Sequence, residues 1–392
     1  MSGQIPLSQP EVTEADCRAV QETLRSGKLT AGPRTDALEQ IIAEWCGRPE
    51  GVAVSSGGAA MHVALTALDI GADDEVILSP FDFIATANDL LRRGAKPVFV
   101  DIDPATLNLN ADGVARAMTE RTRAVVAGHT FGNPAGMDRI ATVAAAHEVP
   151  LIEDATYALG TVCRAGKAGS FGRVAVMSLN AEKGVTCGEG GVILTDDDHL
   201  AQVCRSLRDH GQPVAMDVED PPCAATLRYD RIGCSCRISE ASAALGVSQM
   251  QRLDQVMKVR ERIALSYFDK LMDYGELILP TVDEGVSNCW PVFVVRLTDQ
   301  FTAKQRDRIV KGMGRHEIGC RDPYPPIHLQ PEFRRRLGYN TGDFPVTESL
   351  ACRTIALPMF NQLDATQIEL VSLTLHVMLQ RESLLRGEAN GA

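Results

Sequence analysis

Short β-rich runs alternate with helix-like runs from about residue 50 to residue 210, and this alternation constrains the fold more than any other feature of the chain. The β-rich runs are apolar on both faces, which is typical of a parallel sheet covered by helices on its two sides. The pattern therefore predicts an α/β fold with a mainly parallel seven-stranded sheet. The expected strands are Val52–Val54, Glu75–Leu78, Pro97–Asp101, Ala124–Ala127, Pro150–Glu153, Val174–Leu179 and Gly191–Leu194.

The last two expected strands have only a short connection between them, so part of the sheet is expected to be antiparallel. A long helical pattern from Ser239 to about Met272 leads into a second region. We predict an N-terminal arm and large domain over residues 1–250, and a small C-terminal domain over residues 251–392. Other expected elements are helices Glu14–Ser26, Ala59–Leu68, Ile84–Arg93, Ala111–Thr119, Met137–His147, His199–Arg208 and Gln367–Leu379, the strand Trp290–Leu297 and the Pro-rich loop Asp322–Gln330.

The net charge of −12, from 39 basic and 51 acidic residues, argues against unaided binding to nucleic acid or to an anionic membrane. Neither a signal peptide nor an apolar stretch of about 18 residues is indicated. The 11 cysteines are scattered, which suits reduced thiols in the cytoplasm, and no Cys/His cluster has the spacing of a zinc site. For Cys234 and Cys236, packing is favoured over metal binding. We expect a soluble, cytoplasmic protein with no metal site.

In an open α/β sheet, ligands bind beyond the carboxyl ends of the strands, and glycine-rich or polar segments follow several of the expected strands. The segment Ser55–Ala60 comes directly after one strand and opens a helix. Its glycines, Gly57 and Gly58, would let backbone N–H groups approach a phosphate, which a helix N-terminus also favours. After the next strand, Phe83 offers an aromatic ring that could stack on a flat cofactor.

Two further features follow later strands. Glu153 and Asp154 end one of them, and a carboxylate at such a place can pair with a pyridine nitrogen and keep it protonated. Lys183 lies between a strand and the glycine-rich turn Gly188–Gly191, where burial would lower its pKa and leave the amine nucleophilic. Taken alone, each of the four features also fits an ordinary structural role: a tight turn, a core aromatic, a helix cap or a solvated lysine.

In sequence order, a phosphate turn, a stacking aromatic, a strand-end aspartate and a lysine about 30 residues later form a constellation that suits pyridoxal phosphate (PLP). The chain resembles the DegT/DnrJ/EryC1/StrS sugar aminotransferase family of fold-type-I PLP-dependent enzymes. The resemblance begins at Gly27–Pro33 and continues to the C-terminal helix. Its most specific stretches are Glu153–Gly160, Gly169–Gly172, Ser178–Gly191, Arg208–Gly211, Arg237–Ala241 and Pro325–Gln330.

The resemblance implies a fold-type-I transferase with a large PLP-binding domain and a smaller α+β C-terminal domain. It implies that Lys183 forms the internal aldimine and moves a proton between substrate and cofactor, that Asp154 pairs with the pyridine nitrogen, and that Phe83 stacks on the ring. Ser178 would hold the phosphate together with the backbone of the glycine pair. A homodimer is also implied, with the loop around Arg237 reaching the partner's cofactor.

The chain departs from the family pattern at four positions. Gly58 stands where the family usually has threonine, and Ser235 stands where it usually has asparagine. Tyr157 replaces the common glutamine beside the phenolic oxygen of the cofactor, and Leu159 replaces a common histidine. Each weakened hydrogen bond to a charged group costs about 1.5–3 kcal/mol. These changes are expected to lower the affinity for the cofactor without altering Lys183.

The reaction that the resemblance implies is transamination. An amino donor, glutamate or glutamine, would convert PLP to pyridoxamine phosphate (PMP), which would then aminate a keto sugar, nucleotide-linked, or a keto cyclitol. A PMP-dependent sugar dehydratase is an alternative, although those enzymes generally have histidine in place of the lysine. A non-catalytic relative that binds PLP or a sugar is the other alternative.

Three residues are candidate substrate contacts. Arg321 and His328 flank or belong to the Pro-rich loop that the family places near the sugar, and Arg237 and Arg321 could pair with a diphosphate. A structural role in the loop is the competing interpretation for His328. The unusual Cys234–Cys236 segment suggests a specialised substrate in secondary metabolism.

Overall fold

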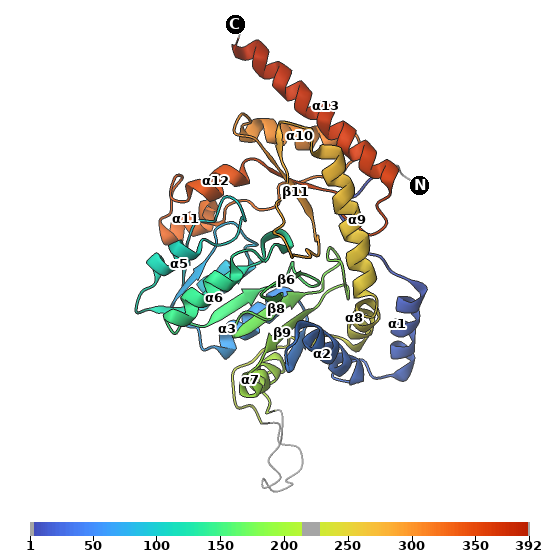
Figure 1. The fold of residues 1–392 in the computed structure, drawn as a ribbon. Helices are drawn as coiled ribbons and strands as arrows, with labels where there is room; N and C mark the ends of the chain where they lie inside the picture. The colour runs from blue at the N-terminus through green and yellow to red at the C-terminus, as the bar shows by residue number, and fades with distance from the viewer. Residues whose placement is uncertain (1–3, 214–227, 391–392) are drawn as a thin grey trace.

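A computed structural model describes residues 4–213 and 228–390, and its centre is a seven-stranded sheet (Figure 1). All strands are parallel except β9, which runs antiparallel to both of its neighbours. The predicted α/β fold and its antiparallel part are therefore confirmed. In spatial order the strands are β1 (Glu50–Val54), β9 (Gly191–Thr195), β8 (Val174–Ser178), β5 (Leu151–Asp154), β4 (Thr122–Gly128), β2 (Glu75–Leu78) and β3 (Lys96–Phe99).

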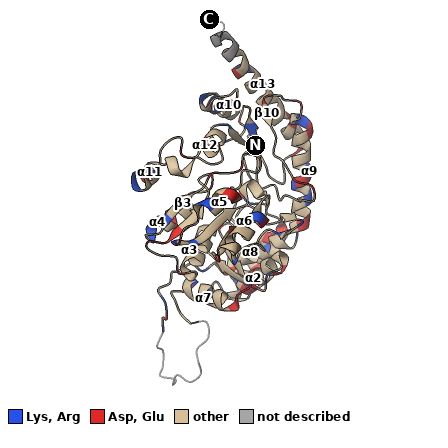
Figure 2. Cartoon of the chain, turned by 60° about the vertical axis from the view of Figure 1, so that its left-hand side comes forward, with Lys and Arg blue, Asp and Glu red and all other residues tan. Residues whose placement is uncertain are grey.

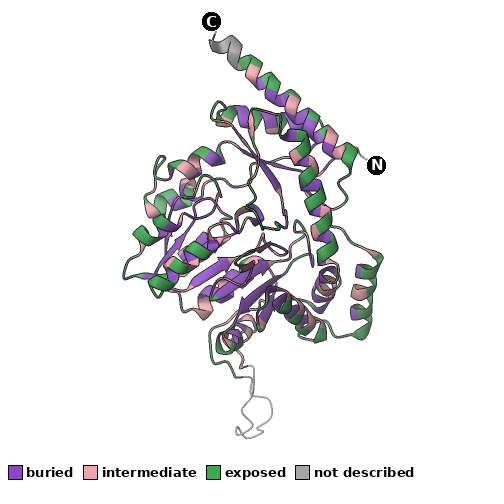
Figure 3. Cartoon of the chain, viewed as in Figure 1, coloured by how far each residue is buried: buried purple, intermediate pink, exposed green. Residues whose placement is uncertain are grey.

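Helices cover both faces of this sheet, and Figure 3 shows the strands buried between them. Alternating side chains divide the core: Val76 and Leu78 of β2 pack on one face, while Ile77 between them packs on the other. Helices α3 (Gly57–Ala67), α4 (Ala85–Arg92) and α7 (Asp198–Arg208) cover the first face. The opposite face packs against α2 (Pro33–Cys46), α5 (Ala111–Ala117), α6 (Met137–Ala146) and α8 (Glu240–Met250).

A second hydrophobic core forms around a three-stranded antiparallel sheet of β10 (Leu277–Ile278), β11 (Phe293–Leu297) and β12 (Thr354–Leu357). It is packed against α9 (Leu253–Leu271), α10 (Ala303–Arg315) and α13 (Ala365–Asn390). Three side chains from the C-terminal third, Ile327, Phe333 and Phe344, instead join the core of the large sheet. The domain boundary at residue 250 stays a prediction. Because these three side chains pack in the core of the large sheet, the C-terminal third of the chain contributes to both hydrophobic cores.

The prediction of one continuous helical segment from Ser239 to about Met272 is wrong, because Gln251 and Arg252 separate α8 from α9. Arg252 leaves the helical conformation there, with φ −118° and ψ 18°, and its guanidinium pairs with the carboxylates of Glu11 and Asp16 near the N-terminus, at 2.8 and 3.0 Å. The predicted first helix is confirmed as α1 (Glu14–Ser26).

Several elements of the fold were not predicted from the sequence. Helices α2 and α10 and the strands β10 and β12 are among them. The Pro-rich loop is irregular as expected, apart from one 3₁₀ turn. The remaining elements are β6 (Val162–Cys163), β7 (Gly166–Lys167), α11 (Pro331–Leu337), α12 (Pro345–Ala351) and the 3₁₀ turns η1 (Thr130–Gly132) and η2 (Ile327–Leu329).

Basic and acidic residues are mixed along outer helices such as α9 (Figure 2). Within residues 4–213 and 228–390, none of the helices combines the length and the apolar character needed to cross a membrane.

Candidate active site

A cavity of about 680 Å³ opens at the carboxyl ends of β2, β5 and β8. This is where ligands bind in open α/β sheets, and the volume lies in the range of small-molecule sites. The cavity collects most of the residues that the sequence singles out. Its lining includes Ser56, Gly57, Gly58, Asp82, Phe83, Asp154, Thr156, Tyr157, Ser178, Glu182, Lys183, Arg321, Asp322 and Tyr324.

The predicted phosphate turn forms the first helical residues of α3. The Ser56 side chain caps this helix by accepting a hydrogen bond from the Ala59 N–H at 3.0 Å. The first N–H groups of a helix have no partner within it, so Gly57 and Gly58 present donors to the cavity. A Cβ atom at Gly57 would lie 2.9 Å from Cβ of Ser178. The glycine therefore lets the Ser178 hydroxyl, at the end of β8, approach the same turn.

Lys183 is buried, with 9% of its surface exposed, and its Nζ lies 2.8 Å from the ring centroid of Tyr157. Burial lowers the pKa of the Lys183 amine to about 7, although the nearby Asp154 and Glu182 carboxylates act in the opposite direction. A large share of this lysine is therefore neutral at pH 7. A neutral, enclosed amine is the form that attacks an aldehyde.

The adjacent acidic residues at the end of β5 point to different surroundings. Asp154 lines the cavity, and its Oδ1 accepts hydrogen bonds from the Thr156 N–H at 3.1 Å and the Thr156 hydroxyl at 2.6 Å. Glu153 is fully buried and contacts His129 Nε2 at 2.7 Å. Although burial alone would raise the pKa of Glu153, its contacts with His129 hold it below the usual value. Of the two carboxylates, Asp154 faces the cavity and Glu153 stabilises the loops behind it.

Two aromatic side chains form walls of the cavity. Phe83 is 62% exposed, so its ring offers a face to a flat ligand. Tyr157 lies below the Lys183 amine and packs edge-on against Tyr324, with ring centroids 6.2 Å apart. The predicted stacking residue and the residue that replaces the family's glutamine therefore belong to the same cavity as Lys183.

The predicted substrate contacts separate into two groups. Arg321 lines the cavity and forms an ion pair with Glu182 at 3.1 Å. His328 is not among the lining residues: it is 0% exposed, and its Nε2 lies 3.0 Å from Oε1 of Glu348. Its burial in the core of the Pro-rich loop supports the competing, structural interpretation. We therefore propose no substrate role for His328.

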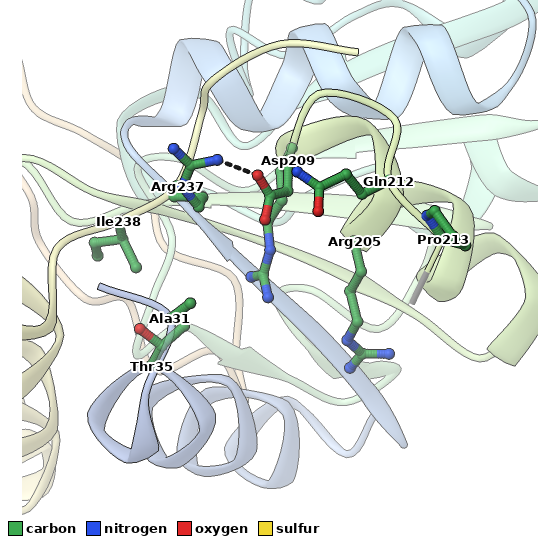
Figure 4. A pocket seen from close by; sticks show the side chains of 9 residues that line it. Ala31, Thr35, Arg205, Asp209, Gln212, Pro213, Arg237 and Ile238 are labelled. Carbon is green, nitrogen blue, oxygen red and sulfur yellow. Dashed lines mark hydrogen bonds and ion pairs between the residues drawn. The ribbon is translucent and has the colours of Figure 1, made fainter. Parts of the chain in front are cut away.

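Ser235 and Arg237 do not line the Lys183 cavity of their own chain. Arg237 forms an ion pair with Asp209 in a separate pocket of about 220 Å³ (Figure 4), and its NH2 group donates to the Ser235 hydroxyl at 3.2 Å. The backbone of this segment nevertheless lies beside the phosphate turn, because the Cys236 carbonyl accepts the Ser55 N–H at 2.8 Å.

Some cavity residues were not singled out from the sequence, among them Asp82, Glu182 and Tyr324. Asp82 and Glu182 directly precede Phe83 and Lys183, so the strand-end rule that indicated those two residues also applies to them. Tyr324 comes from the Pro-rich loop, and only the tertiary fold brings it to the cavity.

The residues present fit PLP. The cavity offers N–H donors at a helix N-terminus for a phosphate, a fixed carboxylate, an exposed aromatic face and a buried amine of lowered pKa. The donor set matches the three parts of this cofactor: its phosphate, its pyridine ring and its aldehyde. No group of His, Cys, Asp and Glu side chains that could hold a metal ion occurs in the part of the chain that the structure describes.

We expect Gly58→Thr to bind PLP about tenfold more tightly than the wild type, which corresponds to about 1.4 kcal/mol from one added hydroxyl donor. The site has room for the side chain, because the nearest atom to a Cβ at Gly58 is the Ser56 Oγ, at 3.9 Å. Equilibrium titration of the cofactor-free protein measures the effect. Gly58→Val, which has the same shape without the hydroxyl, is the matched control, and equal affinities of the two variants would contradict the expectation.

The rate at which cofactor-free protein captures PLP should rise with pH and reach half its maximum near pH 7. Below that pH the Lys183 amine is mostly protonated and cannot attack the aldehyde, while above it the amine is mostly neutral. Stopped-flow absorbance from about pH 5.5 to about pH 9, a range that extends roughly 1.5 units below and 2 units above the expected midpoint, measures this rate. A rate still rising steeply at the upper end would indicate an amine with the ordinary lysine pKa of 10.5.

The sequence profile of the DegT/DnrJ/EryC1/StrS aminotransferase family matches residues 10–376. Among curated proteins, the spore coat polysaccharide biosynthesis protein SpsC of Bacillus subtilis is 33% identical over 378 residues, which cover 93% of this chain and 94% of that protein.

Solved structures agree with this match. The aminotransferase TlmJ from Streptoalloteichus hindustanus superposes with a TM-score of 0.88 at 30% identity, covering 97% of this chain and 100% of that one. The PMP-form of Spr1654 from Streptococcus pneumoniae superposes with a TM-score of 0.91 at 24% identity, covering 96% and 100%, which indicates a shared fold. Spr1654 has also been solved in a PLP-form.

Proposed function

The chain belongs to the DegT/DnrJ/EryC1/StrS aminotransferase family and is a PLP-dependent aminotransferase, and from this premise we propose that it transfers an amino group from glutamate or glutamine to the ketone of a sugar or a cyclitol. The observation that carries the proposal is the buried Lys183 amine in a cavity that also holds Asp154, Phe83 and the glycine turn. These groups lie at the ends of different elements. The stability of the fold alone would not require them to meet in one cavity.

We propose distinct tasks for the residues of the site. PLP supplies an aldehyde and an electron-withdrawing ring when it is bound. Lys183 would hold the cofactor and move the proton at the reacting carbon, and Asp154 would keep the ring nitrogen protonated. Phe83 would stack on the ring, and Tyr157 would donate to its phenolic oxygen. Ser178 would anchor the phosphate together with the N-terminal N–H groups of α3.

The first test is the absorbance of the PLP-loaded protein before and after an amino donor is added. We expect glutamate or glutamine to convert the visible band to the spectrum of PMP, and a keto sugar or keto cyclitol to restore it. A loaded protein that releases ammonia or eliminates water instead would show another reaction class. A protein that forms no visible band at saturating PLP would favour a non-catalytic relative and sink the proposal.

The ketone is proposed to bind beside Glu182, Arg321 and the Pro-rich loop, since these residues line the cavity that holds Lys183. The spore coat polysaccharide role of SpsC supports a carbohydrate substrate. A panel of ketones with and without a linked nucleotide, tested against the PMP-loaded protein, identifies the class. Restoration of the visible band is the readout.

We also propose a homodimer in which Ser235 and Arg237 contribute to the partner's site, because in their own chain they lie outside the Lys183 cavity. If so, inactive Lys183→Ala subunits mixed with impaired Arg237→Ala subunits should regain activity, up to about a quarter of wild-type sites for random pairing. Mixed subunits that stay as inactive as the separate variants would contradict a shared site.

A further inference from the structure

A second carboxylate, that of Asp82, lines the cavity beside Asp154. Asp82 follows β2, Asp154 ends β5, and β4 lies between these strands and ends at Gly128. A Cβ atom at Gly128 would lie 3.1 Å from Oδ2 of Asp82 and 3.9 Å from Cβ of Asp154. The missing side chain at Gly128 is thus what leaves room for the two carboxylates to lie side by side.

The backbone fixes the Asp82 side chain in this place, because its Oδ1 accepts the Phe83 N–H at 2.6 Å. The ionisable groups around it come from several elements: Asp154 from β5, Tyr157 from the turn after it, Lys183 from the turn after β8 and Tyr324 from the Pro-rich loop. Burial, followed by the charge of Asp154, raises the pKa of Asp82 to about 8.

Two neighbouring carboxylates do not ionise independently, because the charge on one opposes the charge on the other. At pH 7 Asp82 is therefore mostly the neutral acid, and it becomes a second negative charge on the cavity floor as the pH rises through about 8. The other carboxylates that line the cavity belong to other segments: Glu182 and Glu189 lie between β8 and β9, and Asp322 lies in the Pro-rich loop.

We propose that Asp82 is a positioning residue that acts through Asp154, so that a pair of carboxylates, rather than one, governs how firmly the ring nitrogen of the bound cofactor holds its proton. This inference rests on the proposed function, in which Asp154 pairs with that nitrogen. An ionised Asp82 adds negative charge beside Asp154, and the pair then keeps the nitrogen protonated to higher pH. The ring then stays an effective electron sink on the alkaline side of neutrality.

The test uses PLP labelled with ¹⁵N at the ring nitrogen, bound to wild-type protein, to Asp82→Asn and to the control Asp322→Asn. The ¹⁵N chemical shift reports the proton on the nitrogen directly and does not depend on turnover. We expect the nitrogen of Asp82→Asn to lose its proton at a pH lower by about one unit, the size of effect that a nearby charge has on a pKa. The control should titrate as the wild type does.

A second measurement needs no cofactor. Labelling the aspartate carboxyl carbons with ¹³C in the cofactor-free protein should reveal one carboxyl that titrates near pH 8, is absent from Asp82→Asn, and shifts toward the ordinary aspartate range in Asp154→Asn. A carboxyl unmoved by Asp154→Asn, or a ring nitrogen unmoved by Asp82→Asn, would overturn the inference while leaving the aminotransferase proposal intact. A wild-type protein that binds no PLP would overturn the proposed function instead.

Discussion

Lys183→Ala should lower the rate of amino transfer by about 10⁴-fold, the upper end of the cost of removing one positioned acid–base group. The variant loses both the amine that holds the cofactor and the group that moves the proton at the reacting carbon. Its fold should persist, because backbone hydrogen bonds hold the turn after β8, from the Leu179 N–H to the Gly190 carbonyl and from the Cys187 N–H to the Leu179 carbonyl, both at 2.9 Å. Steady-state turnover with the preferred ketone measures the loss.

The spectrum separates this interpretation from a loss of folding. Lys183→Ala should still take up PLP, held through its phosphate and ring, but with the spectrum of the free aldehyde. Lys258→Ala, which removes an exposed lysine from α9, serves as the matched control and should keep both the band and the activity. A Lys183→Ala protein that retained the wild-type band would place the cofactor on another lysine.

Asp154→Asn should lower the transfer rate by about 10²–10³-fold, as the removal of one preorganised electrostatic group does. Asparagine keeps the shape of the side chain and its contact with Thr156, but it cannot hold the pyridine nitrogen protonated. The affinity for PLP should fall as well, by about tenfold or more, because a charge-assisted hydrogen bond is lost. Turnover and equilibrium titration measure the two effects separately.

The matched control for this variant is Asp322→Asn, a carboxylate on the wall of the same cavity that belongs to the Pro-rich loop. It should leave the affinity for PLP within about threefold of the wild type, since a wall charge in contact with solvent is screened. If both variants lost affinity equally, the total charge of the cavity, and not the place of Asp154, would be the cause.

The large sheet could be predicted from the sequence because its strands are short apolar runs bounded by glycine, proline and polar residues. Glu75–Leu78 was predicted with the bounds that the structure has. The elements that were missed have weaker local signals. Helix α10 contains many charged residues and few apolar ones, and its packing against α13 is what stabilises it. At the break between α8 and α9, Arg252 forms ion pairs with residues more than 200 positions away, which a local sequence pattern does not reveal.

The location of the site followed from one rule, that ligands bind beyond the carboxyl ends of the strands. The residues that this rule indicated, Gly57, Phe83, Asp154 and Lys183, all line one cavity. Their roles are proposals. The sequence could not indicate which way a side chain points at a strand end or in a loop. His328 turns inward because Glu348, 20 residues away, provides its partner.

Asp82 is a functional candidate that the sequence alone did not indicate. Its place beside Asp154 depends on the register of β2, β4 and β5 and on the absence of a side chain at Gly128. These positions are far apart in the chain. Within a single sequence, the residue is one more polar group in a loop. Only the tertiary structure makes it part of a carboxylate pair.

Borohydride reduction of the PLP-loaded protein, followed by peptide mapping, tests the central claim most directly, because reduction fixes the cofactor to the amine that holds it. Two samples are compared, one reduced at once and one first incubated with the amino donor. The account predicts a phosphopyridoxyl group on Lys183 in the first sample, and its loss in the second, where the cofactor has become PMP. A label on another lysine, or a label on Lys183 that no amino donor removes, would contradict the account.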